Sequence, residues 1–127
     1  MLLKKRQKYS NEKSERKSID IPDEIVNDIL IKLENFEEEC GFTNISLSLG
    51  LLSKQFSTNS TYLSKVINVH KGKSYSKYIN ELRVYYAVDK INNDSSFRKF
   101  TISAIAEESG FKSAETFSKF FNHKWRL

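Results

Sequence analysis

One helix-break-helix pattern occurs twice in the sequence, and this repeat limits the possible folds more than any other feature. Residues 47–67 read LSLGLLSKQFSTNSTYLSKVI, and residues 100–121 read FTISAIAEESGFKSAETFSKFF. The second halves match in chemical type at every position, as LSKVIN in residues 63–68 and FSKFFN in residues 117–122. The alignment slips by one residue between the two halves, so the second turn is predicted to be one residue longer. Such a pattern is typical of two helix-turn-helix units.

Capping residues and apolar spacing predict an all-α fold. A hydroxyl, amide or carboxylate residue precedes each predicted helix, where its side-chain oxygen can accept a hydrogen bond from a free backbone N–H. Gly41, Gly72 and Gly110 follow helical patterns and are predicted to end helices. No alternating strand pattern or Asn-Gly hairpin signal occurs in the sequence. The predicted helix caps are Asp20 (with Pro22 in the first turn), Ser48, Asn59, Thr101 and Ser113.

Charge and apolar pattern divide the chain into three parts. Residues 1–20 are basic and have no apolar period, which predicts a disordered arm. Residues 21–43 predict one acidic amphipathic helix. Its acidic face is expected to be solvated, with covering of the basic domain or contact with a partner as alternatives. Residues 44–127 predict a double helix-turn-helix domain. Within it we expect the first unit at 48–72, the joining helix at 74–91, a loop at 92–100 and the second unit at 101–123.

Composition excludes several functional classes. The 127 residues carry a formal net charge of +5, and the basic character of the repeated part suggests a polyanionic partner. Cys40 is the single cysteine, so no internal disulfide forms. No apolar run is long enough for a membrane segment and no signal peptide is recognisable, which predicts a cytoplasmic protein. His70, His123 and Cys40 have no catalytic or ligand partners at suitable spacing, so we expect no enzyme, metal or cofactor site.

The second helix of each unit presents small polar residues and a lysine once the apolar residues are assigned to the core. Such a face can approach a duplex closely, bond phosphate oxygens and touch base edges in the major groove. The helix N-termini also present free N–H groups to phosphates. The exception is Glu115, which repels phosphates but can accept a hydrogen bond from a cytosine amino group. The candidate contacts to double-stranded DNA are Asn59, Ser60, Thr61, Ser64, Lys65 and Asn68 in the first unit, and Ser113, Ala114, Glu115, Ser118, Lys119 and Asn122 in the second.

Residues 44–123 resemble the DNA-binding domain of AraC/XylS-type bacterial transcription regulators. The most specific parts are KGKSYSKYINELRVYYA at 71–87, similar to the family's run around a Gly-Lys-Ser-aromatic and a Tyr-Ile-Asn, and residues 101–121, similar to its signature around the second unit. The resemblance implies a long helix that joins two units, whose recognition helices lie about one DNA turn apart. Arg83 matches the family's arginine, with a phosphate contact and an ion pair with Glu81 or Asp89 as alternatives.

Departures from the family pattern define further expectations. Gly50 lies where the family usually has a helix former, and 57–58 read Ser-Thr in place of a glycine-containing turn. Residues 122–127 lack the family's closing glycine, proline and final helix, so the second unit is predicted to be short at its C-terminus. Either the chain is a fragment, or this half of the domain folds only marginally. The N-terminal third resembles the segment upstream of this domain in hybrid regulators with tetratricopeptide repeats. Candidate partners therefore include RNA polymerase and an upstream sensor domain. The alternative function is a protein-interaction module without specific DNA binding.

Overall fold

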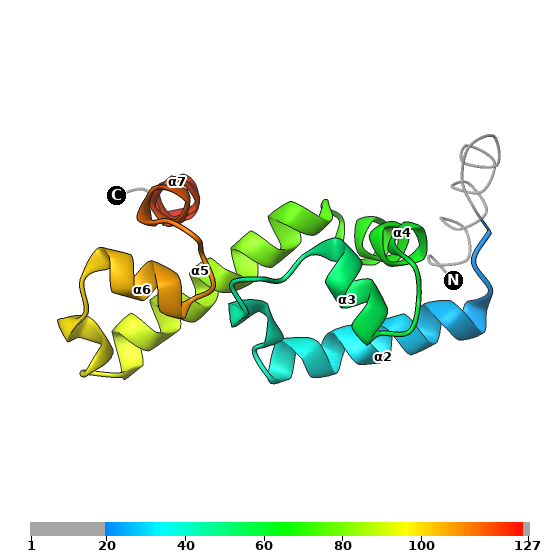
Figure 1. Ribbon diagram of the computed structural model, residues 1–127, viewed down its shortest axis with the longest axis horizontal. Coiled ribbons are helices and arrows are strands. Elements are labelled where there is room, and N and C mark those ends of the chain that lie inside the picture. The colour runs from blue at the N-terminus through cyan, green and yellow to red at the C-terminus, as the bar shows by residue number, and fades with distance from the viewer. Residues whose placement is uncertain (1–19, 126–127) are drawn as a thin grey trace, which may run out of the picture.

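The computed structural model describes residues 20–125, with side chains through residue 123. This part of the chain is helical and contains no strand, which confirms the predicted all-α fold. The predicted basic arm lies outside the described residues, apart from Asp20. The helices are α2 (Asp23–Glu38), η1 (Gly41–Thr43), α3 (Leu49–Gln55), α4 (Ser60–Lys71), α5 (Tyr75–Asn93), η2 (Phe97–Lys99), α6 (Ile102–Glu108) and α7 (Ala114–Trp125). Figure 1 shows an elongated arrangement, in which α5 runs between the group α2–α3–α4 and the pair α6–α7.

Side-chain caps begin most of these helices at the predicted residues. Ser48 Oγ accepts a hydrogen bond from Leu51 N, and Thr101 Oγ1 accepts one from Ala104 N. Asn59 and Ser113 cap α4 and α7 in the same way. Ser74, predicted as about the first residue of the joining helix, is the cap of α5. Each cap satisfies one N–H that the first helical turn leaves without a partner, so these local sequences define the helix starts.

Two predicted boundaries of α2 are wrong. The helix begins after Pro22, which occupies the cap position without a side-chain hydrogen bond, so Asp20 is not the cap. The helix ends at Glu38 with Glu39 as its C-cap, and the left-handed residue that follows is Cys40, with φ of 57°, rather than Gly41. Gly41 is constrained by space instead, because a Cβ there would lie 2.5 Å from the ring of Phe36.

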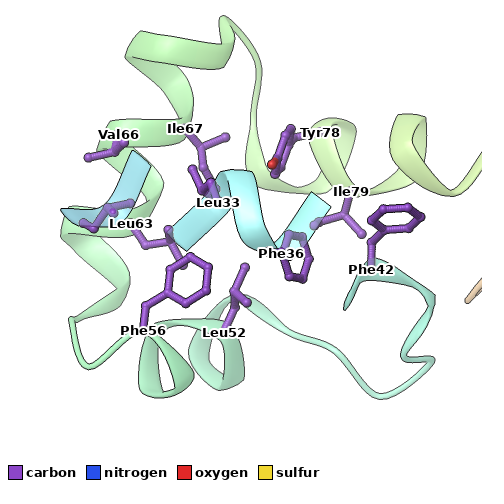
Figure 2. Close-up of a cluster of buried hydrophobic side chains, with 11 residues drawn as sticks. Leu33, Phe36, Phe42, Leu52, Phe56, Leu63, Val66, Ile67, Tyr78 and Ile79 are labelled. Atoms are coloured by element: carbon purple, nitrogen blue, oxygen red, sulfur yellow. The ribbon is translucent and has the colours of Figure 1, made fainter. Parts of the chain in front are cut away.

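The first hydrophobic core draws on four helices and η1. Ile29 and Leu33 of α2 are fully buried, and they share this core with Leu52, Leu63 and Ile67 of the helix-turn-helix pair. Figure 2 shows side chains of α2 lying between those of α3, α4 and α5. The charge and apolar pattern predicts α2 as an element separate from the domain that follows it. In the structure, α2 supplies part of the core on which α3 and α4 pack.

A second core lies at the other end of α5. Val84 and Ala87 of α5 are buried there with Ile105, Phe111 and Phe117 of the second unit. Phe97 of η2 also enters this core, so the predicted loop 92–100 carries a buried anchor. α5 thus packs on the first unit through its N-terminal half, where Tyr78 and Ile79 are buried, and on the second through its C-terminal half.

The internal repeat is longer than the helix-turn-helix pair. In the first unit a long helix, a 3-10 turn, a seven-residue helix and a twelve-residue helix follow one another as α2, η1, α3 and α4. In the second unit α5, η2, α6 and α7 follow in the same order, with the same lengths for the last two helices. α2 therefore supports the first helix-turn-helix as the C-terminal half of α5 supports the second.

Candidate nucleic-acid interface

The two turns within the helix-turn-helix units share one hydrogen-bond pattern. In the first, Thr58 N donates to Ser53 O at 2.9 Å and Ser57 N donates to Lys54 O at 3.0 Å. In the second, Phe111 N donates to Ala106 O at 2.9 Å and Gly110 N donates to Glu107 O at 3.0 Å. This is the Schellman arrangement, which satisfies the last carbonyls of a helix. The Ser-Thr sequence at 57–58 therefore builds the same turn as its glycine-containing counterpart.

The turns differ in length, as predicted. After the shared motif, the first turn passes directly from Thr58 to the cap Asn59, whereas the second inserts Lys112 between Phe111 and Ser113. Lys112 is exposed. α7 therefore begins one residue further from its turn motif than α4 does.

The outward face of α4 contains the residues that the sequence assigned to it. Thr61 and Asn68 are exposed, and Ser64 and Lys65 are half-buried. The Asn68 amide donates to Ser64 O at 3.1 Å, which holds this side chain along the helix while its oxygen stays on the surface. Leu63, Val66 and Ile67 on the other side of α4 are buried and anchor the helix.

Side chains at the start of α4 already have intramolecular partners. Asn59 Oδ1 accepts from Tyr62 N at 2.8 Å, so this oxygen is used as a cap. Ser60 Oγ accepts from Ser53 Oγ at 3.3 Å, which links the two helices of the unit. Asn59 and Ser60 therefore contribute to the geometry of the unit, and Thr61 is the first residue of α4 with an exposed side chain and no such role among the described contacts.

The outward face of α7 repeats that of α4. Glu115, Lys119 and Asn122 are exposed, and Ala114 and Ser118 are half-buried. Ser113 caps the helix through Thr116 N at 3.2 Å and also bonds the Thr116 hydroxyl at 3.0 Å.

Sequence reasoning missed Thr116, which is exposed on the first turn of α7. It occupies the position that the half-buried Tyr62 has in α4. A polar threonine at a position that is aromatic in the first unit was the sequence signal that could have identified it. The exposed Lys112 was also missed, because the repeat has no counterpart for it.

The tertiary structure places α4 and α7 on one edge of the molecule. In Figure 1 both helices are seen nearly along their axes, at opposite ends of the upper edge, whereas α2 lies along the lower edge of the first unit. The axes of the two candidate recognition helices are thus roughly aligned, and both helices lie on the same side.

Arg83 lies where the two units meet. Its Nε donates to Phe42 O at 2.6 Å and its Nη2 donates to Asn44 O at 3.0 Å. The guanidinium carbon lies 5.9 Å from the centroid of the Phe111 ring, a cation–π distance. Burial lowers the pKa of Arg83 from its ordinary value, with the nearby Tyr75 acting in the opposite direction. Of the predicted ion-pair partners, Glu81 forms an ion pair with Lys73. The contacts described for Arg83 are with two carbonyls and a ring.

One carboxylate of the acidic helix α2 contacts the basic domain directly. Glu37 Oε2 lies 3.2 Å from Lys71 Nζ and accepts a short hydrogen bond from the Tyr78 hydroxyl. Burial and this carboxylate raise the pKa of Tyr78 above its ordinary value. Glu34, Glu38 and Glu39, by contrast, are exposed. The predicted acidic face is therefore mostly solvated, and Glu37 is the residue of this face that contacts α4 and α5.

Other kinds of site are not found in the part of the chain that the structure describes. Residues 20–125 contain no group of histidine, cysteine and acidic side chains arranged to hold a metal ion. None of their helices combines the length and apolar character required to cross a membrane. Cys40 is a free cysteine there.

Comparison with known proteins identifies a similar solved structure. It is the C-terminal domain of the two-component response regulator yesN from Fusobacterium nucleatum, with a TM-score of 0.61 and 23% sequence identity. The alignment covers 74% of this chain and 92% of that one. No protein-family model and no curated protein matches the chain. The likeness establishes the fold, a helical domain with two helix-turn-helix units.

Proposed function

We propose that this chain is the sequence-specific DNA-binding part of an AraC-type transcription regulator, in which α4 and α7 enter successive segments of the major groove. The observation that carries the proposal is one outward face that occurs twice. A serine, a lysine and an asparagine at 64, 65 and 68 recur at 118, 119 and 122, each time opposite a buried apolar side. Packing of a core does not require the same polar residues on the outer faces of two helices. Contact of both helices with the same kind of surface does.

The chemistry of this face suits a duplex. Lys65 and Lys119 neutralise phosphates, and the serine hydroxyls bond phosphate oxygens at close approach. The amides of Asn68 and Asn122 have the donor and acceptor pair that suits adenine, and Glu115 suits the amino group of cytosine. Because position 61 is threonine where position 115 is glutamate, the two half-sites are proposed to differ in sequence.

The spacing of the units suits one face of B-DNA. The 19 residues of α5 extend over about 28 Å at 1.5 Å per residue. One turn of the duplex is about 34–36 Å, so recognition helices at the two ends of α5 are suited to adjacent major-groove segments. A single chain would then read both half-sites without forming a dimer.

The wider role follows from the same proposal. The similar solved structure is described as part of a two-component response regulator, and a regulatory role in the bacterial cytoplasm is proposed here on that likeness and on the AraC/XylS-like motifs. Double-stranded DNA is the proposed partner, with RNA polymerase and a sensor domain upstream of α2 as further partners. Catalysis and a cofactor have no part in this role.

Selection of binding sites from a random duplex pool tests the proposal. The purified 127-residue chain is incubated with the pool at near-physiological salt, and enriched sequences are read after several rounds. We expect a bipartite site with half-sites about ten base pairs apart. Affinity for that site should fall steeply with salt, because phosphate contacts release counterions.

The other outcomes are equally specific. A single enriched half-site would restrict recognition to the first unit and contradict the two-groove model. No enrichment by protein with a helical circular dichroism spectrum would reject DNA recognition. It would favour the protein-interaction module, for which the exposed Phe100 and Ile102 beside α6 are candidate contacts.

A further inference from the structure

The position of the second unit depends on more than α5. The Gly110–Phe111 turn of the second unit lies against Phe42 and Thr43 of the first, because a Cβ at Gly110 would lie 2.7 Å from Phe42 O and 3.0 Å from Thr43 Cα. Gly110 has a φ of 104°, a conformation that side chains rarely adopt. Close approach and backbone conformation therefore both require glycine at this contact.

Arg83 ties together the elements that meet there. From α5 its guanidinium reaches two carbonyls in the segment that links α2 to α3, and it covers the ring of Phe111 in the second unit. The same hypothetical Cβ at Gly110 would lie 2.7 Å from Arg83 Nε. A planar guanidinium has donors in fixed directions, so two simultaneous carbonyl bonds restrict its orientation. One side chain thus contacts α5, the first unit and the second unit at once.

We propose that Arg83, together with the Gly110–Phe111 turn, holds the second unit at a fixed angle to the first and so determines which half-site spacing the protein accepts. Arg83 is then a positioning residue for DNA recognition and does not itself contact DNA. The spacing claim rests on the proposed function, whereas the claim about the angle between the units does not. Without the joint, the second unit would remain attached through α5 but could tilt on it.

The spacing claim follows from the geometry of the duplex. Each base pair inserted between half-sites moves them apart by about 3.4 Å and rotates one relative to the other by about 34–36°. Two recognition helices held rigidly can fit half-sites at only one separation and one relative rotation. Two helices that can tilt fit several spacings, but they bind the preferred spacing with lower affinity.

The chain offers a matched control. Arg98 Nε donates to Ile91 O at 2.7 Å and its Nη2 donates to Asn92 O at 3.1 Å. This is the same two-carbonyl arrangement, but all of its partners belong to the second unit and the end of α5. Arg98→Met therefore removes equivalent hydrogen bonds without touching the contact between units.

The first arm of the experiment needs no DNA. Spin labels are attached at Thr61→Cys on α4 and Glu115→Cys on α7, both exposed positions, in the 127-residue protein that carries Cys40→Ser. We expect Arg83→Met to broaden or shift the distance distribution between the labels, and Arg98→Met to leave it unchanged. Arg83→Lys, which keeps the positive charge and a single donor nitrogen, provides a milder second variant if Arg83→Met does not fold. An unchanged distribution in a folded Arg83 variant overturns the inference.

The second arm uses unlabelled protein and duplexes with the selected half-sites spaced 9 to 12 base pairs apart. We expect a change of one base pair from the preferred spacing to weaken binding of the unsubstituted protein about tenfold. The same change should weaken binding of Arg83→Met about threefold or less. A uniform loss of affinity at every spacing, with an unchanged label distance, would mean that Arg83 contacts phosphate and would overturn the inference. If no half-sites are selected, the proposed function fails, and the label distances still decide the role of Arg83 in the joint.

Discussion

Ser57 and Gly110 occupy the same position in the two helix-turn-helix turns, and both have positive φ, at 57° and 104°. Each donates its N–H to the carbonyl three residues earlier, and the next residue bonds the carbonyl five residues before it. Gly110 is buried against the first unit, whereas Ser57 is exposed. The same turn is therefore built by two different residues. Glycine is suited to this backbone conformation in the second unit, whereas Ser57 is strained by it in the first.

Replacing Ser57 by glycine should stabilise the protein. Relief of the left-handed conformation is worth about 1–2 kcal/mol, and the greater flexibility of the unfolded chain offsets about half of it. We expect a net gain of about 0.5–1 kcal/mol in the free energy of unfolding, measured by urea denaturation. Gly110→Ala, the reciprocal change, should cost about 2 kcal/mol or more, because the methyl group meets Phe42 O. A loss of stability in Ser57→Gly, or no loss in Gly110→Ala, would contradict this account of the two turns.

Gly50→Ala should also stabilise the protein. Gly50 lies in the first turn of α3, is exposed, and has open space around it, because a Cβ there would meet nothing closer than Ser48 Oγ at 4.0 Å. Alanine is favoured over glycine in a helix by up to about 1 kcal/mol. We expect the midpoint of thermal unfolding to rise by about 3–5 °C. Ser103→Ala, at the equivalent position of α6, is the control and should give a smaller rise. A fall in the midpoint for Gly50→Ala would show that α3 needs glycine there.

Tyr78→Phe should lower stability in a pH-dependent way. The Tyr78 hydroxyl is bound to Glu37 and its pKa is raised by burial, the hydrogen bond and the carboxylate charge. The folded state therefore holds the phenolic proton more tightly than the unfolded state, whose pKa is about 10. Stability from this group is fully present below pH about 10 and is lost as the pH rises further.

The test compares the two proteins in urea across pH. We expect Tyr78→Phe to be less stable by about 1.5–3 kcal/mol at pH 7, the usual range for a hydrogen bond to a charged group. The difference should shrink between about pH 10 and 11. A difference that stays constant over this range would mean that the hydroxyl is not held protonated by the fold.

Lys65→Ala and Lys119→Ala should each weaken DNA binding. Each lysine is assigned to about one phosphate, so its loss should lower affinity several-fold for all sequences and reduce the slope of log K against log salt by about 1. Lys99→Ala is the control, because Lys99 is exposed on η2, which in Figure 1 is the yellow segment on the other side of the molecule from α7. Unchanged affinity in both recognition-helix variants would reject the assigned faces.

The sequence by itself determined the helices and their order. Hydroxyl and amide caps at Ser48, Asn59, Ser74, Thr101 and Ser113 act on backbone groups three residues away, so they can be recognised locally. The apolar spacing that buries Leu63 and Phe117 is also local, because a helix repeats every 3.6 residues. The duplicated outward faces follow from the same period.

Only the tertiary structure decided which helices share a core and how the units meet. Nothing in the pattern of α2 distinguishes a separate amphipathic helix from one that completes the first core, because its apolar side would be the same in both cases. The two carbonyls that bind Arg83 lie 41 and 39 residues away from it in the sequence. A backbone carbonyl is present at every residue and carries no sequence signal, so the joint that positions the second unit appears only when the chain is folded.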